Sequence, residues 1–253
     1  MSFAVSADAY GQFMGRFSEP LAAQFAAFSR LAPGQRALDV GCGPGALTAV
    51  LVAELGAEMV SAVDPSESFV AAVRERLPGV DVRAGSAEAL PWPDGGFDCV
   101  AAQLVVHFMG DPVAGMAEMA RVARPGGTVA VTVWDFAGGA APVSPFWRAA
   151  REVDPAARDE AGLAGAADGH LASLLRQAGL AGVESGALTV RLEFSSFEQW
   201  WRPFTLGVGP AGGYLAALDG KRRRAVREAC ARQFPRGPFT LPARAWAARG
   251  RVA

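Results

Sequence analysis

One stretch, Ala37–Thr48, constrains the fold more than any other part of the chain. The apolar run Ala37–Val40 leads directly into three closely spaced glycines, Gly41, Gly43 and Gly45, and then into a helix-forming segment. Glycine tolerates positive φ and lets backbone N–H groups approach a ligand that a Cβ would keep away. The helix that follows points its partly positive N-terminus at the same place. The pattern predicts a cofactor-binding turn between a buried strand and a helix.

The same strand-then-helix rhythm continues as far as Trp134. Apolar segments at 36–40, 58–63, 80–84, 97–106 and 128–134 read as strands, and helical patterns or loops separate them. Such alternation is typical of a doubly wound parallel sheet, which binds ligands at the carboxyl ends of its strands.

The chain after Trp134 breaks this rhythm. Residues 183–194 and 239–248 are predicted to form two late antiparallel strands, and 195–237 is too long for a tight connection. We therefore predict a single α/β domain over 1–253, with a doubly wound seven-stranded sheet, mostly parallel, whose last strand is antiparallel. N-terminal helices occupy 1–32, with Pro20 expected to divide the apolar stripe of 9–31 into two helices. The core spans 33–194 and 238–253, and 195–237 forms an inserted helical cap.

The overall composition limits which partners and which cellular compartment are expected. The net charge of -1 gives no electrostatic reason for a nucleic-acid partner or an anionic membrane surface. Cys42, Cys99 and Cys230 are too scattered for a disulfide framework or a zinc site, which favours reduced thiols in a cytoplasm. With only two histidines and no clustered carboxylates, no metal site is expected. No leader pattern and no membrane-spanning apolar stretch is apparent.

The glycine run alone does not identify the cofactor. It satisfies the dinucleotide pattern GxGxxG/A, and Asp64 follows about twenty residues later, where a carboxylate can accept both hydroxyls of an adenosine ribose. This arrangement suits NAD and S-adenosylmethionine equally. No Gly-Lys-Ser/Thr follows, which excludes a phosphate-binding P-loop. A short-chain dehydrogenase is disfavoured because neither Tyr10 nor Tyr214 has a lysine four residues on.

Five ordered segments resemble the successive motifs of class I S-adenosylmethionine-dependent methyltransferases, specifically the type 11 methyltransferase domain. The segments are Ala37–Thr48, Asp64-Pro65-Ser66, Gly85–Pro91, Phe97-Asp98 and Arg121–Gly127. The resemblance runs in register from about Ala37 to Trp134. It implies a Rossmann-like fold, S-adenosyl-L-methionine as methyl donor and S-adenosyl-L-homocysteine as product.

The resemblance also implies roles for the residues of the glycine loop. Gly41 and Gly43 are expected to approach the methionine part of the cofactor, with Asp39 orienting its ammonium through water or the loop. Cys42 lies between them, and we interpret its side chain as a small buried filler, not a nucleophile. Asp64 is expected to hold the ribose hydroxyls.

Further cofactor contacts are expected outside the loop. Pro65 is expected to lie against the adenine, with Ser86 and Ala87 at its edge. Ser86 stands where the family usually has aspartate, and a hydroxyl accepts a hydrogen bond less strongly than a carboxylate. The backbone carbonyl of Gln103 is expected to accept from the ammonium. Tyr10 and Arg16 are expected to close over the site, with Arg16 near the carboxylate of the cofactor.

The predicted chemistry is direct displacement, which requires alignment and exclusion of water more than a nucleophile or a metal. The predicted acceptor is an oxygen or nitrogen atom, with carbon as a further option, of a small apolar or aromatic metabolite. If the acceptor must lose a proton, His107 is the first candidate base and Asp135 the second; a packed or surface role is the alternative for His107. The predicted substrate-binding residues are Trp134, Trp201, Arg202, Phe204 and Tyr214.

Three alternatives stay open at this point. The first is an NAD-dependent oxidoreductase on a similar fold, and the second is a cofactor-binding protein without methyl transfer. A nucleic-acid methyltransferase is the third, opposed by the charge balance and by the lack of an Asn/Asp-Pro-Pro-Tyr/Phe motif.

Overall fold

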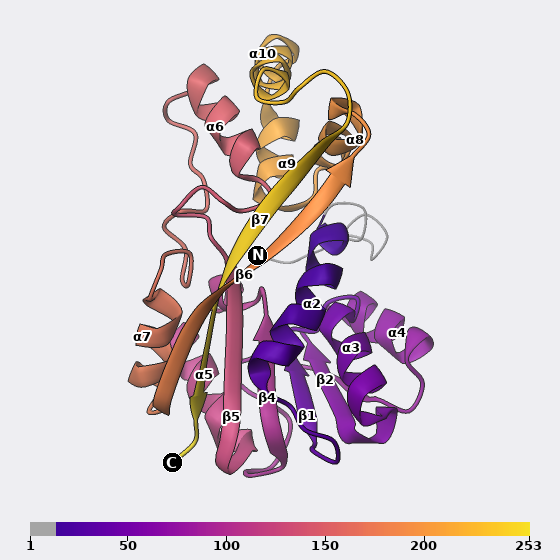
Figure 1. The fold of residues 1–253 in the computed structure, drawn as a ribbon, viewed down its shortest axis with the longest axis vertical. Coiled ribbons are helices and arrows are strands. Elements are labelled where there is room, and N and C mark those ends of the chain that lie inside the picture. The colour runs from indigo at the N-terminus through magenta and orange to yellow at the C-terminus, as the bar shows by residue number, and fades with distance from the viewer. Residues whose placement is uncertain (1–13) are drawn as a thin grey trace.

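A single seven-stranded sheet organises the molecule. The computed structural model describes residues 14–253, and its strands are arranged in the order β3-β2-β1-β4-β5-β7-β6 (Figure 1). The pairs among β1 to β5 are parallel, whereas β7 runs antiparallel to both β5 and β6. The seven-stranded, mostly parallel sheet expected from the sequence is thus confirmed. The strands are β1 (Ala37–Val40), β2 (Val60–Asp64), β3 (Asp81–Ala84), β4 (Phe97–Gln103), β5 (Ala123–Trp134), β6 (Ala181–Phe194) and β7 (Phe239–Arg251).

The strand order changes direction between β1 and β4. β1 lies between β2 and β4, so that Asp39 is paired with Ala62 on one side and Ala101 on the other. Every residue of β1 and β2 is buried, as expected for strands covered by helices on both faces. In open α/β sheets, ligands bind outside the carboxyl ends of the strands at such a switch point.

Helices cover both faces of the sheet. On one face lie α2 (Arg16–Ser29), α3 (Ala46–Leu55) and α4 (Glu67–Arg76), and on the other lie α5 (Pro112–Val122) and α7 (His170–Gln177) (Figure 1). Phe25 of α2 and Leu51 of α3 are fully buried together against Ala37 and Ala101 of the sheet. The short turns η2 (Ala57–Met59) and η3 (Val106–Phe108) precede β2 and follow β4.

The prediction that Pro20 divides the N-terminal segment is wrong for the part that the structure describes. Pro20 lies inside the continuous helix α2. A proline here removes one backbone hydrogen bond near the start of the helix. The buried face formed by Phe17, Leu21 and Phe25 packs on the sheet and offsets that loss.

The last two strands extend beyond the rest of the sheet. β7 pairs with β5 only as far as Trp134↔Ala245, but it continues to pair with β6 through Phe194↔Phe239. A two-stranded ribbon therefore projects past the carboxyl end of β5 (Figure 1). Residues 195–237 connect the tip of one strand to the tip of the other, so the cap is placed above the carboxyl edge of the sheet.

The cap contains more of the chain than the predicted insertion. Its elements are α8 (Phe197–Trp201), η4 (Arg202–Leu206), α9 (Gly209–Ala217) and α10 (Gly220–Ala231), together with α6 (Ser144–Val153) from the segment after β5. α6 packs against α10 at the same end of the molecule (Figure 1). The basic run 221–224 of α10 is exposed, whereas Val226, Ala229 and Cys230 are buried. The run thus forms the solvated face of an amphipathic helix.

Within residues 14–253, none of the helices has the length and apolar character needed to cross a membrane.

Candidate active site

The glycine loop joins β1 to α3 at the switch point. The N–H groups of Gly41 and Cys42 both donate to the carbonyl oxygen of Val63 in β2, at 2.8 and 3.0 Å. Gly41 has a φ of +69°, and a Cβ there would lie 2.5 Å from a methyl carbon of Val105. Gly43 also has positive φ, +52°, but a Cβ there would meet nothing within 4 Å. Gly41 is thus packed against the protein, and Gly43 is open on the side where a ligand can approach.

Asp64, the last residue of β2, holds this loop in place. Its Oδ2 accepts a hydrogen bond from the N–H of Gly43 at 2.9 Å, and its Oδ1 accepts one from the N–H of Ser66 at 2.8 Å. The side chain is buried, which raises the pKa of the carboxyl group. Each carboxylate oxygen can accept a second hydrogen bond. The geometry therefore leaves Asp64 able to accept from ligand hydroxyls, and Pro65 follows it at the same edge.

Asp39 lies one layer below the loop. It is 1% exposed and accepts a hydrogen bond from the hydroxyl of Thr48 at 2.6 Å. Burial raises the pKa of Asp39 to about 7. Asp39 is thus bonded to the start of α3 and closed off from direct contact with a ligand, and its indirect role stays a prediction.

Cys42 points its side chain into the protein. The thiol is buried with Ala62, Val70 and Val73, and burial raises its pKa well above its ordinary value. This placement agrees with a packing role for the side chain. Only the backbone of Cys42 takes part in the loop.

The loop after β3 places Ser86 and Ala87 near the same edge. Ser86 forms an isolated bridge with Ala89, which turns the chain back, and Ala87 is buried. The Ser86 hydroxyl makes no hydrogen bond within residues 14–253. It is therefore free to accept from a ligand.

At the end of β4 the backbone adopts a strained conformation. Leu104 has a φ of +62°, a left-handed value that costs a non-glycine residue about 1–2 kcal/mol. The preceding Gln103 uses its side-chain amide to donate to the carbonyl of Ser18 in α2 at 3.1 Å, and its buried Oε1 has no partner in the described part of the chain. The turn at Leu104 directs η3, with His107, over the sheet edge. Such strain is typical of functional sites.

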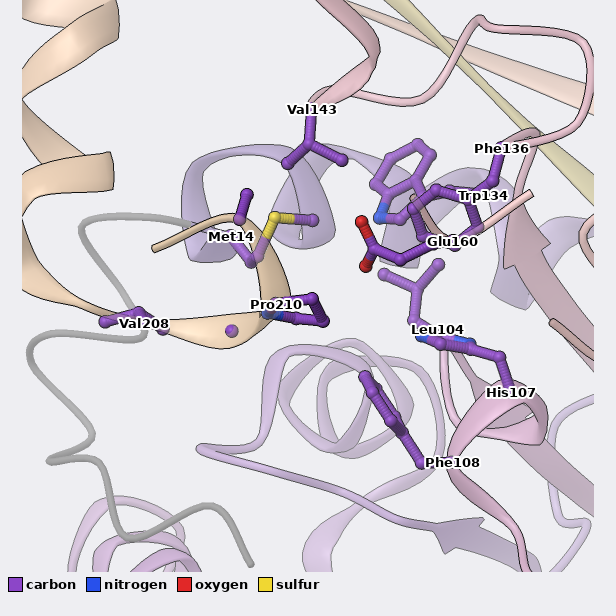
Figure 2. Close-up of a pocket in the computed structure, with 12 residues that line it drawn as sticks. Met14, Leu104, His107, Phe108, Trp134, Phe136, Val143, Glu160, Val208 and Pro210 are labelled. Atoms are coloured by element: carbon purple, nitrogen blue, oxygen red, sulfur yellow. The ribbon is translucent and has the colours of Figure 1, made fainter. Parts of the chain in front are cut away.

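An apolar cavity with about 510 Å³ of empty space opens beside this turn (Figure 2). Leu104, His107 and Phe108 supply one wall, and Trp134 and Phe136, at the end of β5, supply a second. The cap and the preceding loops close it with Val143, Glu160, Val208, Gly209, Pro210 and Ala211, and Met14 of the N-terminal segment also lines it. The cavity is thus bounded by the sheet edge on one side and by the cap on the other.

Glu160 is the charged lining residue that the sequence did not reveal. It lies in the loop between α6 and α7, is 8% exposed, and points its carboxylate into the cavity (Figure 2). Its Oε2 accepts a hydrogen bond from the indole Nε1 of Trp147 at 2.7 Å. Burial raises the pKa of Glu160 to about 7. The segment around Glu160 is rich in Ala and Gly and shows no motif, so only its three-dimensional position marks it.

The two residues predicted as candidate bases are placed differently. His107 lines the cavity, its buried Nδ1 has no hydrogen-bond partner among residues 14–253, and burial lowers its pKa to about 3. Asp135 is buried, and its Oδ2 accepts from Arg244 at 2.5 and 2.8 Å while Oδ1 accepts from the N–H of Gly138 at 2.7 Å. Asp135 is therefore engaged in an ion pair outside the cavity lining.

The structure brings only part of the predicted substrate-binding set to the cavity. Trp134 lines it, whereas Phe204 lines a neighbouring cavity of about 310 Å³ that also includes Arg16 and Phe17. Phe204 stacks on Phe146 of α6 with ring centroids 4.9 Å apart.

The other three predicted substrate-binding residues are packed inside the cap or exposed to solvent, and none lines the main cavity. Trp201 is buried in the same aromatic cluster as Phe146, and Tyr214 packs on Phe146 and Trp147. Arg202 is exposed and lies outside the linings of both cavities. This placement does not support the prediction that these three residues bind substrate. These aromatic rings form the core of the cap together with Phe146 and Trp147 of α6.

Of the two residues expected to close over the cofactor, one is described. Arg16 is directed toward β6, where its guanidinium lies 4.8 Å from the centroid of the Phe194 ring and donates to the carbonyl of Glu193. It does not reach the glycine loop. Tyr10 lies outside the described residues.

Comparison with known proteins shows what part of the chain is similar to. Residues 38–131 match the profile of a family described as a methyltransferase domain. A demethylmenaquinone methyltransferase of Beutenbergia cavernae is 41% identical over 99 residues, which cover 39% of this chain and 40% of that protein. The chain thus aligns with less than half the length of this relative.

Solved structures show the same fold over almost the whole chain. A crystal structure described as a putative methyltransferase from Bacillus halodurans superposes with a TM-score of 0.59 at 17% identity, covering 91% of this chain and 98% of that one. The [4+2]-cyclase SpnF superposes with a TM-score of 0.59 at 23% identity, covering 93% and 82%. The sheet order 3-2-1-4-5-7-6 with β7 antiparallel is that of the Rossmann-like methyltransferase fold. The match to the methyltransferase domain family covers residues 38–131, and the similarity of the rest of the chain is one of fold.

Proposed function

We propose that the chain is an S-adenosylmethionine-dependent methyltransferase whose acceptor is a small apolar or aromatic molecule. One observation carries the proposal: the segment that lines one side of the apolar cavity also packs against the glycine loop. Val105 lies against Gly41, while Leu104 before it and His107 two residues after it line the cavity. A ligand held on the loop and a molecule held in the cavity would therefore be adjacent.

The residues of the loop fit the proposed cofactor. Gly43 leaves open space where a Cβ would project, and Asp64 presents oxygens with free acceptor capacity at the end of β2. We assign Asp64 to the ribose hydroxyls, Pro65, Ser86 and Ala87 to the adenine, and the loop with the Gln103 carbonyl to the methionine part. The match of residues 38–131 to a methyltransferase family supports this cofactor over NAD.

When bound, S-adenosylmethionine supplies a methyl group on a positively charged sulfur, already activated for displacement. The chain's own residues then orient the acceptor and exclude water. Leu104, Trp134 and Phe136 provide a flat apolar surface for the acceptor, and the cap closes over it with Val208 and Pro210. An apolar ring compound suits this lining, and one relative is a demethylmenaquinone methyltransferase. We expect transfer to oxygen or nitrogen, with carbon as a further option.

Charge and composition support a small-molecule acceptor and a cytoplasmic location. A net charge of -1 and a solvated basic run on α10 favour a small-molecule acceptor over nucleic acid or a membrane surface. Three buried cysteines without disulfide bonds suit a reducing cytoplasm.

Calorimetric titration of the purified protein with S-adenosylhomocysteine and, in parallel, with NAD⁺ tests the proposal. We expect one-to-one binding of S-adenosylhomocysteine and no heat from NAD⁺. Binding of NAD⁺ alone would support the oxidoreductase alternative. Cofactor binding without turnover on a broad panel of acceptors would support a cofactor-binding protein that transfers no methyl group.

A further inference from the structure

Glu160 is a buried carboxylate in a cavity that is otherwise almost entirely apolar. Among the described residues that line the cavity, it is the only carboxylate, and Figure 2 shows its oxygens directed toward Met14. Burying a carboxylate is costly unless hydrogen bonds compensate it. A purely structural position would be better filled by an apolar side chain, so the presence of Glu160 calls for a functional reason.

The hydrogen bonding of Glu160 is incomplete within residues 14–253. Trp147 donates its indole N–H to Oε2, which fixes the orientation of the side chain. Oε1 has no donor among these residues. Oε1 is not one of the fully buried polar atoms without a partner, so it is open to the cavity that Glu160 lines. The free oxygen therefore marks the place where a ligand donor fits.

Other titratable groups near the cavity serve this purpose less well. His107 shares the lining, but burial lowers its pKa to about 3, so that it is neutral and a weak proton acceptor at pH 7. Asp135 is occupied by Arg244 and the N–H of Gly138. Glu160, whose pKa burial raises to about 7, has the proton affinity that suits a general base near neutral pH.

Glu160 also lines a second cavity, which has about 600 Å³ of empty space on its other side. Arg148 and Arg151 of α6 and Asp159 line the same cavity, and Arg151 is paired with Asp159. This cavity provides a polar route by which a proton on Glu160 can reach solvent.

We propose that Glu160 binds the O–H or N–H of the methyl acceptor and removes its proton as the methyl group is transferred. The bond between the acceptor atom and the methyl carbon forms, the bond between that carbon and sulfur breaks with its electron pair going to sulfur, and the acceptor proton goes to Oε1 of Glu160. The acceptor is thus an apolar molecule with one hydroxyl or amine group. This inference rests on the proposed function and adds the acceptor class and the catalytic base.

The test uses two probes of the same shape, 2-naphthol and naphthalene, with the full-length protein in the presence of S-adenosylhomocysteine. Binding is followed by the indole N–H signal of Trp147 in ¹⁵N–¹H spectra, assigned by Trp147→Phe. We expect 2-naphthol affinity to increase up to about tenfold from pH 6 to pH 8, because that is the change in the ionised fraction of a group with a pKa of about 7. Naphthalene affinity should not change with pH.

Variants separate a role in binding from a role in folding. Glu160→Gln keeps an acceptor for Trp147 but should abolish the pH dependence of 2-naphthol binding, and Glu160→Met should reduce the preference for 2-naphthol over naphthalene by about tenfold or more. Glu152→Gln, which changes an exposed glutamate of α6, should behave as wild type. Thermal unfolding and S-adenosylhomocysteine affinity of the variants establish that fold and cofactor site are intact.

The outcomes are distinct from those that test the proposed function. Failure of the wild-type protein to bind S-adenosylhomocysteine overturns the proposed function, whatever the probes do. The assignment of Glu160 is overturned if neither probe binds, if wild type binds both equally, or if Glu160→Gln keeps the pH dependence. It is supported only if the preference for 2-naphthol and its pH dependence both depend on Glu160.

Discussion

The backbone N–H of Gly43 donates to Oδ2 of Asp64 at 2.9 Å, and this hydrogen bond holds the loop after β1 against the end of β2. The second oxygen of Asp64 is held by the N–H of Ser66 at 2.8 Å. The carboxylate is thus oriented before any ligand arrives, which reduces the ordering needed on binding.

Asp64→Asn should weaken S-adenosylhomocysteine binding by about 10- to 100-fold. An amide nitrogen cannot accept from Gly43 or Ser66, and hydrogen bonds to a charged acceptor contribute about 1.5–3 kcal/mol. Calorimetric titration measures the change. Asp168→Asn, at an exposed aspartate, is the control and should bind as wild type. Unchanged affinity in Asp64→Asn would contradict the assignment of Asp64 to the ribose.

Gly41→Ala and Gly43→Ala should separate stability from binding. Both place a Cβ at positive φ, which costs about 1–2 kcal/mol. Gly41→Ala adds a clash with Val105, for a further loss of about 1–3 kcal/mol in the free energy of unfolding. Gly43→Ala meets nothing in the protein and should mainly reduce cofactor affinity. Urea unfolding and calorimetry measure the two effects, and equal loss of stability in both variants would be inconsistent with this geometry.

The buried carboxyl of Asp39 should make stability depend on pH. Its pKa is raised from 3.8 to about 7, so between these values the native protein holds a proton that the unfolded chain releases. The contribution of Asp39 is full below pH 3.8 and is lost as the pH rises to about 7.

Relative to Asp39→Asn, wild type should therefore gain on the order of 2–4 kcal/mol in the free energy of unfolding when the pH falls from 8 to 4. Urea unfolding of both proteins over this pH range measures the difference. The contributions of the other titrating groups are the same in both proteins and cancel. If the difference in free energy of unfolding between the two proteins did not vary with pH, Asp39 would not have a raised pKa in the native protein.

Arg244→Met should destabilise the protein by about 3–5 kcal/mol, because it leaves Asp135 buried without its cation. The double variant Arg244→Met/Asp135→Asn should recover much of this loss, since the uncompensated charge is gone. Urea unfolding of both variants and of Asp135→Asn completes the cycle. A double variant that is less stable than Arg244→Met would exclude a coupled pair.

The features that could be predicted from the sequence are those set by short segments. The loop at Gly41–Gly45 and the position of Asp64 depend on a strand, a turn and the next strand, all of which leave local patterns. The antiparallel pair at the end of the chain also has a local signal in two apolar runs. These parts of the prediction are confirmed by the observed sheet order.

Features that depend on distant contacts could not be predicted in this way. Phe204 and Trp201 pack against Phe146, which lies about 55 residues earlier in α6. The sequence does not show this packing, so it predicts the two residues as substrate contacts instead. Glu160 was missed for the same reason, since its cavity combines β4, β5 and the cap. Pro20 was expected to end a helix because the sequence does not show how strongly the α2 face is buried.

The most direct measurement follows backbone amides in ¹⁵N–¹H spectra as S-adenosylhomocysteine is added. The account predicts saturating shifts concentrated at Gly41, Gly43 and Ser66, with smaller changes at Leu104 and in the cavity wall. NAD⁺ at the same concentrations should leave these signals in place. Absence of shifts, or shifts confined to residues away from the carboxyl ends of β1 and β2, would contradict the central claim that this loop holds the methyl donor.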